Sequence, residues 1–333
     1  MSGSVRTRVV ALCGGVGGAK LAFGLSRVLP PEELCIVVNT GDDFEHFGLH
    51  ISPDIDTVIY TLADIAHEGQ GWGRADEQWT VMQELEHLGG ESWFKLGDRD
   101  IALHLLRTQM LRAGKTLTEA TAQLTARFGL RHAVLPMSNG PVRTFVETDE
   151  GDLAFQDYFV RRRCEPKVRA LRYAGADQAQ IPIEVARALD DKNLRGVIVC
   201  PSNPYLSIAP MLAVAGMRER LRDLSAPVLA VSPIIGGRAL KGPAAKMMGE
   251  LGAHSGALDI ARMYRDFIDV LMVDTKDAAL ECERSANDPL LLIGDIVMAS
   301  REARALIWRV AVLRISMKCA KANRMEYFQR RKQ

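Results

Sequence analysis

The chain of 333 residues carries 42 lysines and arginines against 41 aspartates and glutamates, and 47% of its residues are apolar. A formal net charge of +1 lacks the basic footprint of a general nucleic-acid-binding protein, so we expect a small-molecule ligand and no nucleic-acid partner. The apolar content can form a large core, and the length favours one large domain or two of ordinary size.

Five short runs of β-branched and other apolar residues alternate with helical patterns, at residues 8–13, 34–39, 196–200, 227–232 and 269–274. Such alternation predicts βαβ units and a mainly parallel sheet that is covered by helices on both faces. The sequence therefore predicts an α/β protein with a Rossmann-like, doubly wound sheet.

The middle of the chain differs in character. Residues 62–130 show helical patterns and no convincing strand, including an amphipathic pattern at 100–114. Thr116 and Glu119 have the spacing of a capping box that opens a further helix, and residues 143–160 have the pattern of a β-hairpin.

These patterns predict a mostly helical cap inserted into the sheet domain. We expect a discontinuous nucleotide-binding core at residues 1–60 and 165–316. An inserted cap with helices and a hairpin is expected at residues 61–164, and a basic tail at residues 317–333.

The cysteine spacing and the N-terminal residues favour a cytoplasmic protein. The six cysteines include no C-x-x-C pair, so they predict neither a zinc site nor a disulfide framework. No apolar run approaches 18 residues, and the first residues, MSGSVRTR, lack the apolar segment of a signal peptide. We therefore expect no membrane partner.

A glycine-rich turn, GGVGGAK, joins the first predicted strand to a predicted helix. Glycines allow a phosphate to approach the backbone, and a helix N-terminus presents free N–H groups to it. The turn departs from the dinucleotide fingerprint, because Lys20 stands where the third glycine would be, and from the P-loop, because Ala19 precedes the lysine. A phosphate-binding loop and a tight turn without a ligand both remain open.

Four carboxylates follow the second predicted strand, within the stretch NTGDDFEHFGLHISPDIDTVIY: Asp42, Asp43, Asp54 and Asp56. Their position at the carboxyl edge of the sheet suggests an oxygen-ligated Mg²⁺. Two alternatives compete with this interpretation. Asp42 or Asp43 could bind a cofactor ribose, and Asp54 or Asp56 could cap the helix that follows.

Polar and aromatic residues that could contact a ligand gather in a second stretch, WFKLGDRDIALH. Asp98 or Asp100 is expected to cap the following helix, and Lys95 or Asp98 could contact a ligand. Trp93 or Phe94 would offer a stacking surface for a flat ring.

Two further stretches follow predicted strands. Ser202 and Asn203, in CPSNPYLSIAP, could hold a base or a phosphate, or form a plain turn. The stretch SPIIGGRALKGPAAK, at residues 232–246, could close the other side of the same crevice.

Seven of these stretches occur in one order along the chain: GGVGGAK, NTGDD, SPDIDTVIYTL, KLGDRD, LPMSNGPVRT, PSNPYLSIAP and SPIIGGRALKGPA. Together they closely resemble the CofD family, the 2-phospho-L-lactate transferases. The resemblance implies transfer of a phospholactyl, enolpyruvyl-phosphoryl or phosphoglyceryl group from a GDP-linked donor to the ribityl hydroxyl of the deazaflavin Fo. GMP would be released, and the product would be a precursor of coenzyme F420.

The resemblance also implies roles for individual residues. Asp42 and Asp56 would be catalytic and would hold Mg²⁺, with Asp43 as a further candidate ligand. Fo would be contacted by Asp56, Lys95 and Asp98. The guanosine nucleotide would be bound by Gly14, Gly15, Gly17, Gly18, Lys20, Ser202 and Asn203. Family members often have GGTGTPK at the glycine loop, so a threonine hydroxyl is absent here and the loop relies on its amides and Lys20.

Two rival functions are compatible with parts of the pattern. One is a CofD-like regulator that binds a nucleotide sugar without catalysis; the cap residues and the acidic pair argue against it. The other is an NAD(P)-dependent Rossmann dehydrogenase; the missing third glycine and the surplus of carboxylates argue against it. The resemblance also implies a homodimer.

Overall fold

The computed structural model describes residues 7–67, 69, 73–239, 242–252 and 256–298. The predicted basic tail at 317–333 and the end of the predicted core lie outside these residues. No helix in the described part of the chain is long and apolar enough to cross a membrane.

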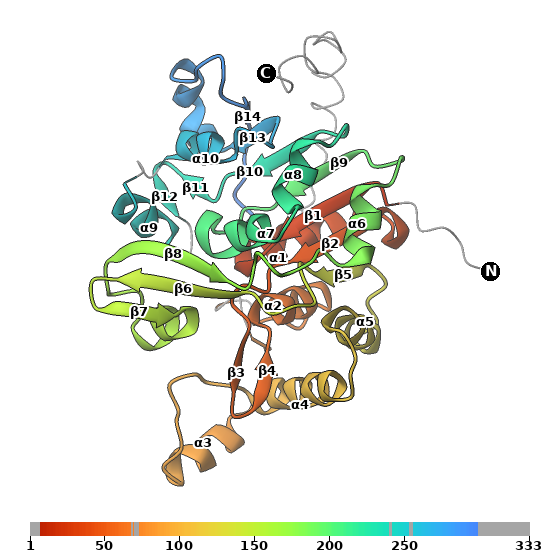
Figure 1. Cartoon of the computed structure of the whole chain (residues 1–333), viewed down its shortest axis with the longest axis vertical. Helices are drawn as coiled ribbons and strands as arrows, with labels where there is room; N and C mark the ends of the chain where they lie inside the picture. The colour runs from red at the N-terminus through yellow and green to blue at the C-terminus, as the bar shows by residue number, and fades with distance from the viewer. Residues whose placement is uncertain (1–6, 68, 70–72, 240–241, 253–255, 299–333) are drawn as a thin grey trace, which may run out of the picture.

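A seven-stranded sheet forms the centre of the fold (Figure 1). Every strand pair in it is parallel. The strands lie in the spatial order β5 (Ala133–Pro136), β2 (Leu34–Val38), β1 (Val9–Cys13), β9 (Gly196–Val199), β10 (Val228–Val231), β13 (Val270–Val273) and β14 (Leu290–Ile293). From β1 the chain first adds β2 and β5 on one side. It then returns to the other side of β1 and adds β9, β10, β13 and β14. This is the doubly wound arrangement that the alternating pattern predicted.

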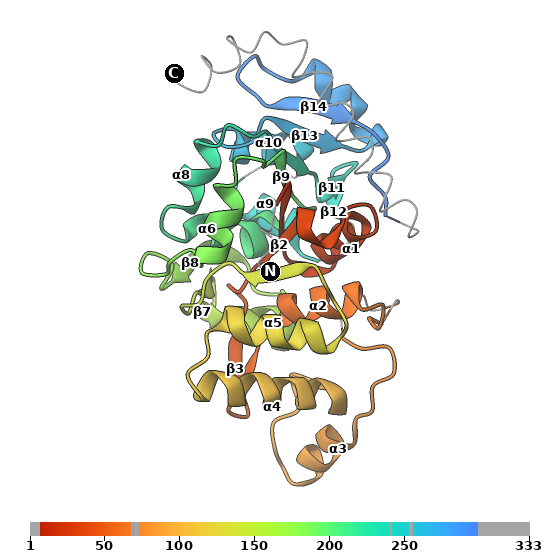
Figure 2. The same cartoon turned by 90° about the vertical axis from the view of Figure 1, so that its right-hand side faces the viewer.

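Helices cover both faces of this sheet, and β1 shows why (Figure 2). All five of its residues are buried, because alternate side chains enter different cores. Val10 and Leu12 pack in one core; Val9 and Ala11 pack in the other. The second of these cores also takes side chains from α1 (Gly15–Ser26), α2 (Pro53–Leu62) and α5 (Leu117–Arg127). The first takes them from α6 (Ile183–Leu189), α7 (Ala209–Ala213), α8 (Met217–Arg222), α9 (Ala244–Glu250) and α10 (Ala257–Tyr264).

The five strands predicted from the sequence match β1, β2, β9, β10 and β13. The two strands at the sheet edges, β5 and β14, were missed. Their sequences, AVLP and LLLI, each hold a single β-branched residue, so they lack the β-branched enrichment that separates a short strand from a helix segment. Because β5 pairs with β2, the predicted cap segment 61–164 contributes a strand to the core and does not lie wholly outside it.

The helical part of the predicted cap contains α3 (Thr80–His87), α4 (Asp98–Arg112) and α5. The helix predicted at 100–114 is confirmed as α4, and the capping box of Thr116 and Glu119 is confirmed at the start of α5. A short hairpin, β3 (Phe44–His46) with β4 (Leu49–Ile51), packs on α4. Figure 2 shows α4, and beyond it α3, on the side of α2 and α5 that faces away from the sheet.

A three-stranded antiparallel sheet completes the cap region, in the order β7 (Gly151–Ala154), β6 (Arg143–Thr148) and β8 (Val168–Ala174). The predicted hairpin is confirmed for residues 143–154. Its last part instead forms a π-helix, Asp157–Arg161. Strand β8 lies in the range predicted as core but pairs only with this small sheet among the described strands.

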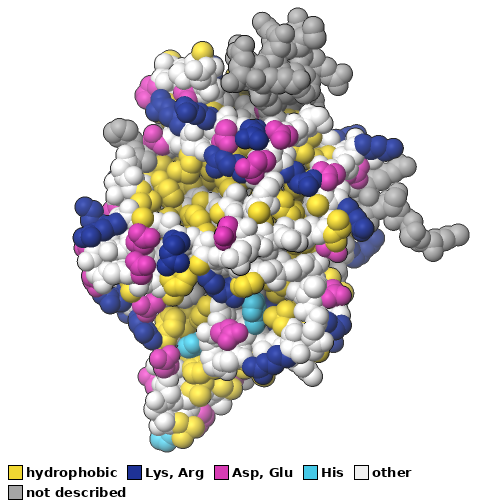
Figure 3. Space-filling view, in the orientation of Figure 1, with side chains coloured by type: hydrophobic (Ala, Val, Ile, Leu, Met, Phe, Trp, Pro, Cys, Tyr) yellow, Lys and Arg dark blue, Asp and Glu magenta, His cyan; other side chains and the backbone are white. Residues whose placement is uncertain are grey.

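The remaining elements are short. They are β11 (Ile234–Ile235) with β12 (Arg238–Ala239), a second π-helix (Pro204–Ile208) and two 3₁₀ helices (Pro31–Glu33 and Thr275–Cys282). On the face of the molecule in Figure 3, acidic and basic side chains are interspersed, as a net charge near zero leads one to expect.

Candidate functional site

A cavity of about 910 Å³ opens where the described loops after β1, β9 and β10 meet. Strand β1 lies between β2 and β9, so this is the point where the strand order reverses. Open α/β sheets bind ligands in the crevice at such a switch point. Side chains of α2, of the segment before α4 and of the π-helix Asp157–Arg161 line the rest of the cavity.

The glycine loop lies at one end of the cavity and touches the loop after β9 closely. The Gly14 amide donates to Ser202 Oγ at 3.0 Å. A Cβ atom on Gly17 would lie 2.3 Å from the carbonyl oxygen of Pro201, and Gly15 has a φ of +63°. Gly14 and Gly17 therefore need to be glycine because of close approach, since a Cβ atom on Gly14 would lie 2.5 Å from Asp54 Oδ2. Gly15 needs to be glycine because of its left-handed backbone.

Six residues predicted to bind the nucleotide line this end of the cavity: Gly14, Gly15, Gly17, Lys20, Ser202 and Asn203. Gly18 lies behind them, where a Cβ atom would meet Ser202 Oγ at 2.7 Å. Because α1 begins at Gly15, the amides of Val16 and Gly17 belong to its first turn and have no acceptor within the helix. Such amides are suited to an anionic ligand.

Two carboxylates face the same end of the cavity and share one buried amide. Asn39 Nδ2 lies 3.2 Å from Asp42 Oδ1 and 3.0 Å from Asp54 Oδ2. The other oxygen of Asp54 accepts the Gly15 amide at 2.6 Å. Burial, and after it the charge of Asp54, raises the pKa of Asp42 well above its ordinary value; burial raises the pKa of Asp54 to about 6. A cation between them would offset both effects.

The donor set fits Mg²⁺ in one specific way. The described residues contain no group of three or more histidine, cysteine, aspartate or glutamate side chains arranged to hold a metal. Mg²⁺ is commonly bound by one or two carboxylates, with water and substrate phosphates as its other ligands. Asp42 and Asp54, beside a loop suited to phosphate, match that arrangement.

Asp56 is not part of this pair. Both of its oxygens bind the guanidinium of Arg107, with Arg107 Nη1 3.0 Å from Asp56 Oδ2 and Nη2 in contact with Oδ1. His104 Nδ1 lies 3.6 Å from the same Oδ2. In the structure Asp42 therefore lies beside Asp54, whereas the predicted partner Asp56 is bonded to Arg107. Two residues along an α-helix turn the side chain by about 200°, so Asp54 and Asp56 contact different neighbours although both line the cavity.

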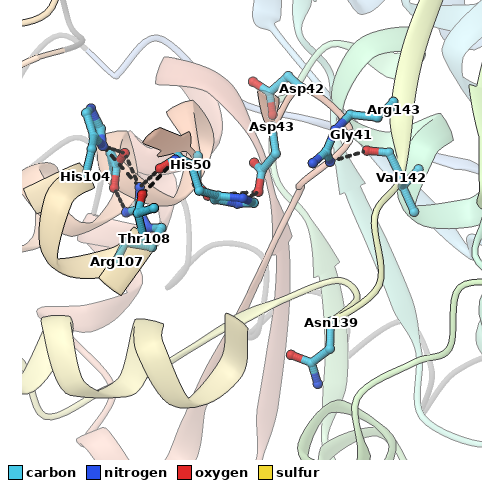
Figure 4. Close-up of polar contacts among 12 residues, drawn as sticks. Gly41, Asp42, Asp43, His50, His104, Arg107, Thr108, Asn139, Val142 and Arg143 are labelled. Carbon is cyan, nitrogen blue, oxygen red and sulfur yellow. Dashed lines mark hydrogen bonds and ion pairs between the residues drawn. The ribbon is translucent and has the colours of Figure 1, made fainter. Parts of the chain in front are cut away.

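Arg107 and His104 lie side by side on α4, with Arg107 Nη1 3.3 Å from His104 Nδ1 (Figure 4). Both side chains approach Asp56. Arg107 has no exposed surface at all. The Asp56 carboxylate, which outweighs the effect of burial, raises the pKa of Arg107, whereas burial lowers the pKa of His104 to about 4. His104 is therefore neutral, and the buried charge of Arg107 is balanced by Asp56.

Asp43, the further candidate metal ligand, faces away from Asp42 (Figure 4). Its Oδ2 accepts from Ser52 Oγ at 2.8 Å and lies 3.1 Å from His50 Nε2. Asp43 is thereby bonded to the start of α2 and to β4, and it does not line the cavity.

The stretch before α4 supplies the middle of the cavity. Lys95 and Phe94 line it, as does Asp100, which accepts the Tyr60 hydroxyl at 2.6 Å. Asp98 does not line it. Its carboxylate accepts the backbone amides of Thr80 at 3.2 Å and Val81 at 3.1 Å, at the start of α3. The Asp98 carboxylate therefore caps α3 and not α4, the helix that the sequence predicted it or Asp100 to cap, and Asp100 takes the cavity position.

Aromatic and aliphatic side chains line further parts of the cavity. Ile51, Phe94 and Leu96 belong to one apolar cluster, and Phe155 packs against Phe159, with ring centroids 5.3 Å apart. Trp93 does not line it; its ring packs against Phe94, with centroids 5.6 Å apart, and beneath the Arg161 guanidinium. Of the predicted aromatic pair, Phe94 is the one in position to stack on a ligand.

Several site residues were missed by the sequence analysis: Asn39, Tyr60, His104, Arg107, Phe155, Gln156 and Phe159. Asn39 and Tyr60 stand inside the candidate stretches of the sequence, but their charged neighbours carried the stronger signal. Arg107 interrupts the apolar pattern of a predicted helix, a signal of a buried charge that could have been followed. Phe155 and Phe159 lie within the predicted hairpin and carried no signal of their own.

The fold and the site define a doubly wound α/β protein with an acidic, glycine-lined crevice at its switch point. The sequence model of the family described as 2-phospho-L-lactate transferase CofD matches residues 9–299. The chain belongs to the CofD family, a family of transferases.

Curated relatives agree with this assignment. A protein of Methanosarcina mazei named 2-phospho-L-lactate transferase is 39% identical over 290 residues, which cover 85% of this chain and 94% of that protein. A protein of Kitasatospora aureofaciens named phosphoenolpyruvate transferase is 42% identical over 312 residues, covering 90% and 97%. A solved structure of a UPF0052-family protein from Bacillus halodurans superposes with a TM-score of 0.52 at 15% identity, covering 88% of this chain and 89% of that one. The last likeness concerns the fold alone.

The Asp56–Arg107 pair predicts a large effect on stability. Asp56→Asn removes the carboxylate that balances a fully buried guanidinium, and breaking such a pair from one side costs about 3–5 kcal/mol. We expect chemical denaturation to show a loss of that order. The double variant Asp56→Asn with Arg107→Gln removes both charges and should recover much of the loss. A single variant as stable as the wild type would contradict the pairing.

Asp54 predicts a pH dependence. Its folded pKa of about 6 lies above its ordinary value of 3.8, so the folded state binds the proton more tightly than the unfolded state. In metal-free buffer, wild-type protein should therefore gain stability relative to Asp54→Asn as the pH falls from 7.5 to 5, by on the order of 1–3 kcal/mol. Thermal and denaturant unfolding at each pH measure this difference. A difference that does not change with pH would show that the Asp54 carboxylate is not destabilised by its surroundings.

Proposed function

We propose that this protein transfers a phosphorylated 2-hydroxy-acid-type group from a GDP-linked donor to the terminal ribityl hydroxyl of Fo, releasing GMP and forming a precursor of coenzyme F420. The observation that carries the proposal is one cavity with two kinds of lining. Glycine amides, Lys20 and carboxylates line one part of it, and aromatic side chains line others. A transferase that joins two substrates needs such a site, where both are held at once.

The donor belongs at the glycine end. The first-turn amides of α1 and the Lys20 ammonium match the charge of a diphosphate. Ser202 and Asn203 line the cavity next to them and supply short polar groups for the rest of the nucleotide. The donor's distal phosphorus would then lie near Asp42 and Asp54.

The acceptor belongs beside the aromatic side chains of the cavity. Phe94, Phe155 and Phe159 offer ring faces and edges for a flat tricyclic heterocycle. Lys95 and Asp56, which the resemblance assigns to Fo, line the same cavity. Because Arg107 engages both oxygens of Asp56, that carboxylate is fixed in place.

The chemistry places negative charge on the transferred phosphate. The acceptor hydroxyl attacks the distal phosphorus, a new P–O bond forms, and the bond to the GMP phosphate breaks. When bound, Mg²⁺ held by Asp42 and Asp54 would neutralise the phosphate oxygens and align the two partners. Lys20 and the α1 amides act on the same charge.

The proton of the attacking hydroxyl needs an acceptor. Asp42 and Asp54 are the carboxylates that line the cavity beside the glycine loop, and one of them would accept this proton. Gln156 Nε2 donates to the Asp42 backbone carbonyl at 3.2 Å and so ties the loop of Asp42 to the cap.

Family membership favours a transferase over the dehydrogenase and over the non-catalytic regulator. The two relatives named above differ in the acid that their names carry, phospholactate or phosphoenolpyruvate. We therefore propose either of these acids, or phosphoglycerate, as the transferred group. A homodimer in the cytoplasm stays a prediction from the sequence.

The proposal is tested by incubating the protein with Fo, Mg²⁺ and each GDP-linked donor and measuring product mass. One donor should give a product heavier than Fo by the matching phospho-acid, together with GMP. Absence of product with all three donors from folded protein would contradict the proposal.

The role of the acidic pair is tested in the same assay. Asp42→Asn should lower turnover about a hundredfold or more, the scale seen when one electrostatic contact to a transition state is lost. Asp223→Asn, an exposed aspartate at the end of α8, is the matched control and should keep normal turnover. Mg²⁺ should also raise the melting temperature of wild type more than that of Asp42→Asn. Near-normal turnover of Asp42→Asn would place the metal elsewhere.

A further inference from the structure

Helices α2 and α4 face each other across one wall of the cavity with four polar side chains. Asp56 and Tyr60 are four residues apart on α2, and Asp100 and His104 are four residues apart on α4, so each pair lies on one helix face. All four line the cavity. Tyr60 contacts Asp100, and Asp56 faces His104, which shows that the two helices run antiparallel here.

These four residues form a polar wall with two layers, Asp56 with His104 and Tyr60 with Asp100. The layers differ in the hydrogen-bond acceptors that they leave for a ligand. In the Asp56 layer, Arg107 bonds both carboxylate oxygens. In the Asp100 layer, the Tyr60 hydroxyl donates only to Oδ1, at 2.6 Å. The carboxylate of Asp100 thus keeps an oxygen that can accept a hydrogen bond from a ligand in the cavity.

Asp100 is also held firmly. Its backbone amide donates to Glu77 Oε1 at 3.2 Å, and the amide of Arg99 donates to Glu77 Oε2 at 3.0 Å. Glu77 therefore anchors the first turn of α4, while Tyr60 fixes the Asp100 side chain. A carboxylate fixed at both ends is pre-organised to accept a hydrogen bond in one direction.

The position of Asp100 along the cavity selects the part of a ligand that it meets. Asp54 touches the glycine loop, and Tyr60 lies six residues further along α2, a rise of about 9 Å. An acceptor whose reacting hydroxyl lies at the glycine end would reach Asp100 with the part most distant from that hydroxyl. Phe94 and Leu96, which line the cavity just before α4, are apolar neighbours suited to a flat ring.

We propose that Asp100, held by Tyr60, accepts a hydrogen bond from a ring donor of the acceptor heterocycle and is thereby a specificity-determining residue. The donor is a ring imide N–H or a ring hydroxyl, since an ionised carboxylate accepts hydrogen bonds and does not donate them. The inference rests on the proposed function in taking Fo as the acceptor. A site built to pair such a donor rejects analogues that lack it.

The test is equilibrium binding without a phosphate donor, so that no turnover occurs. Three ligands are compared: Fo, an analogue methylated at the imide nitrogen and an analogue whose ring hydroxyl is replaced by hydrogen. Wild type should bind one of the analogues about ten- to a hundredfold more weakly than Fo. The analogue that loses affinity identifies the donor group.

Asp100→Asn is the informative variant. Its amide oxygen can still accept the Tyr60 hydroxyl, so the fold is retained, while its NH₂ group faces the ligand and cannot accept. Fo should bind more weakly, and the preference for Fo over that analogue should fall toward one. Tyr60→Phe, which removes only the bond that holds the carboxylate, should reduce the same preference in part.

Asp98→Asn is the matched control. Asp98 lies two residues from Asp100 on the same helix. Its carboxylate caps α3 and does not line the cavity. This variant should keep the wild-type preference. If Asp100→Asn keeps that preference too, or if wild type does not distinguish Fo from either analogue, the inference is wrong while the proposed function stands. If folded wild type does not bind Fo at all, the proposed acceptor fails and the inference fails with it.

Discussion

The structure depends on the close contact between the glycine loop after β1 and its two neighbours, the loop after β9 and the first turn of α2. Gly14 bonds Ser202, Gly17 lies against the Pro201 carbonyl, and Gly15 bonds Asp54. Three segments distant in sequence therefore meet at the switch point of the sheet. Their contact brings the α1 amides, the acidic pair and the polar turn after β9 to one end of one cavity.

A second constraint fixes the other half of the site. Arg107 is completely buried and bonds Asp56, so α4 is bound to α2 by a charge pair that neither helix can lose alone. This pair sets the position of α4 and hence of Asp100, while the segment that leads into α4 carries Phe94 and Lys95. The inserted helices and the sheet domain form one site for this reason, although the chain between them is long.

The sequence predicted most of the fold because parallel strands buried on both faces appear as continuous apolar runs, as β1 and β2 do. It missed β5 and β14, which hold one β-branched residue each and so resemble short apolar helix segments. The glycine loop and its partners after β9 were predictable, since each follows a strand directly and parallel strands end at the same edge.

The errors in the site arose where neighbouring residues of one type had to be told apart. Asp54 and Asp56 are the same residue type two positions apart, and only the helical rotation between them decides which one faces Asp42. Asp98 and Asp100 differ in their partners for a related reason. Asp98 caps α3, and only the tertiary structure brings α3 to it. Arg107 was missed because its function depends on a partner about fifty residues away in sequence.

The central claim is that one cavity holds a guanosine nucleotide and a deazaflavin at the same time, at opposite ends. Titration of Fo into the protein with and without saturating GDP and Mg²⁺, followed by calorimetry, tests it most directly. The account predicts that Fo binds in both cases with one site per chain, and at least as tightly when GDP is present. Loss of Fo binding as GDP saturates the protein would show that the two ligands compete for one place and would contradict the account.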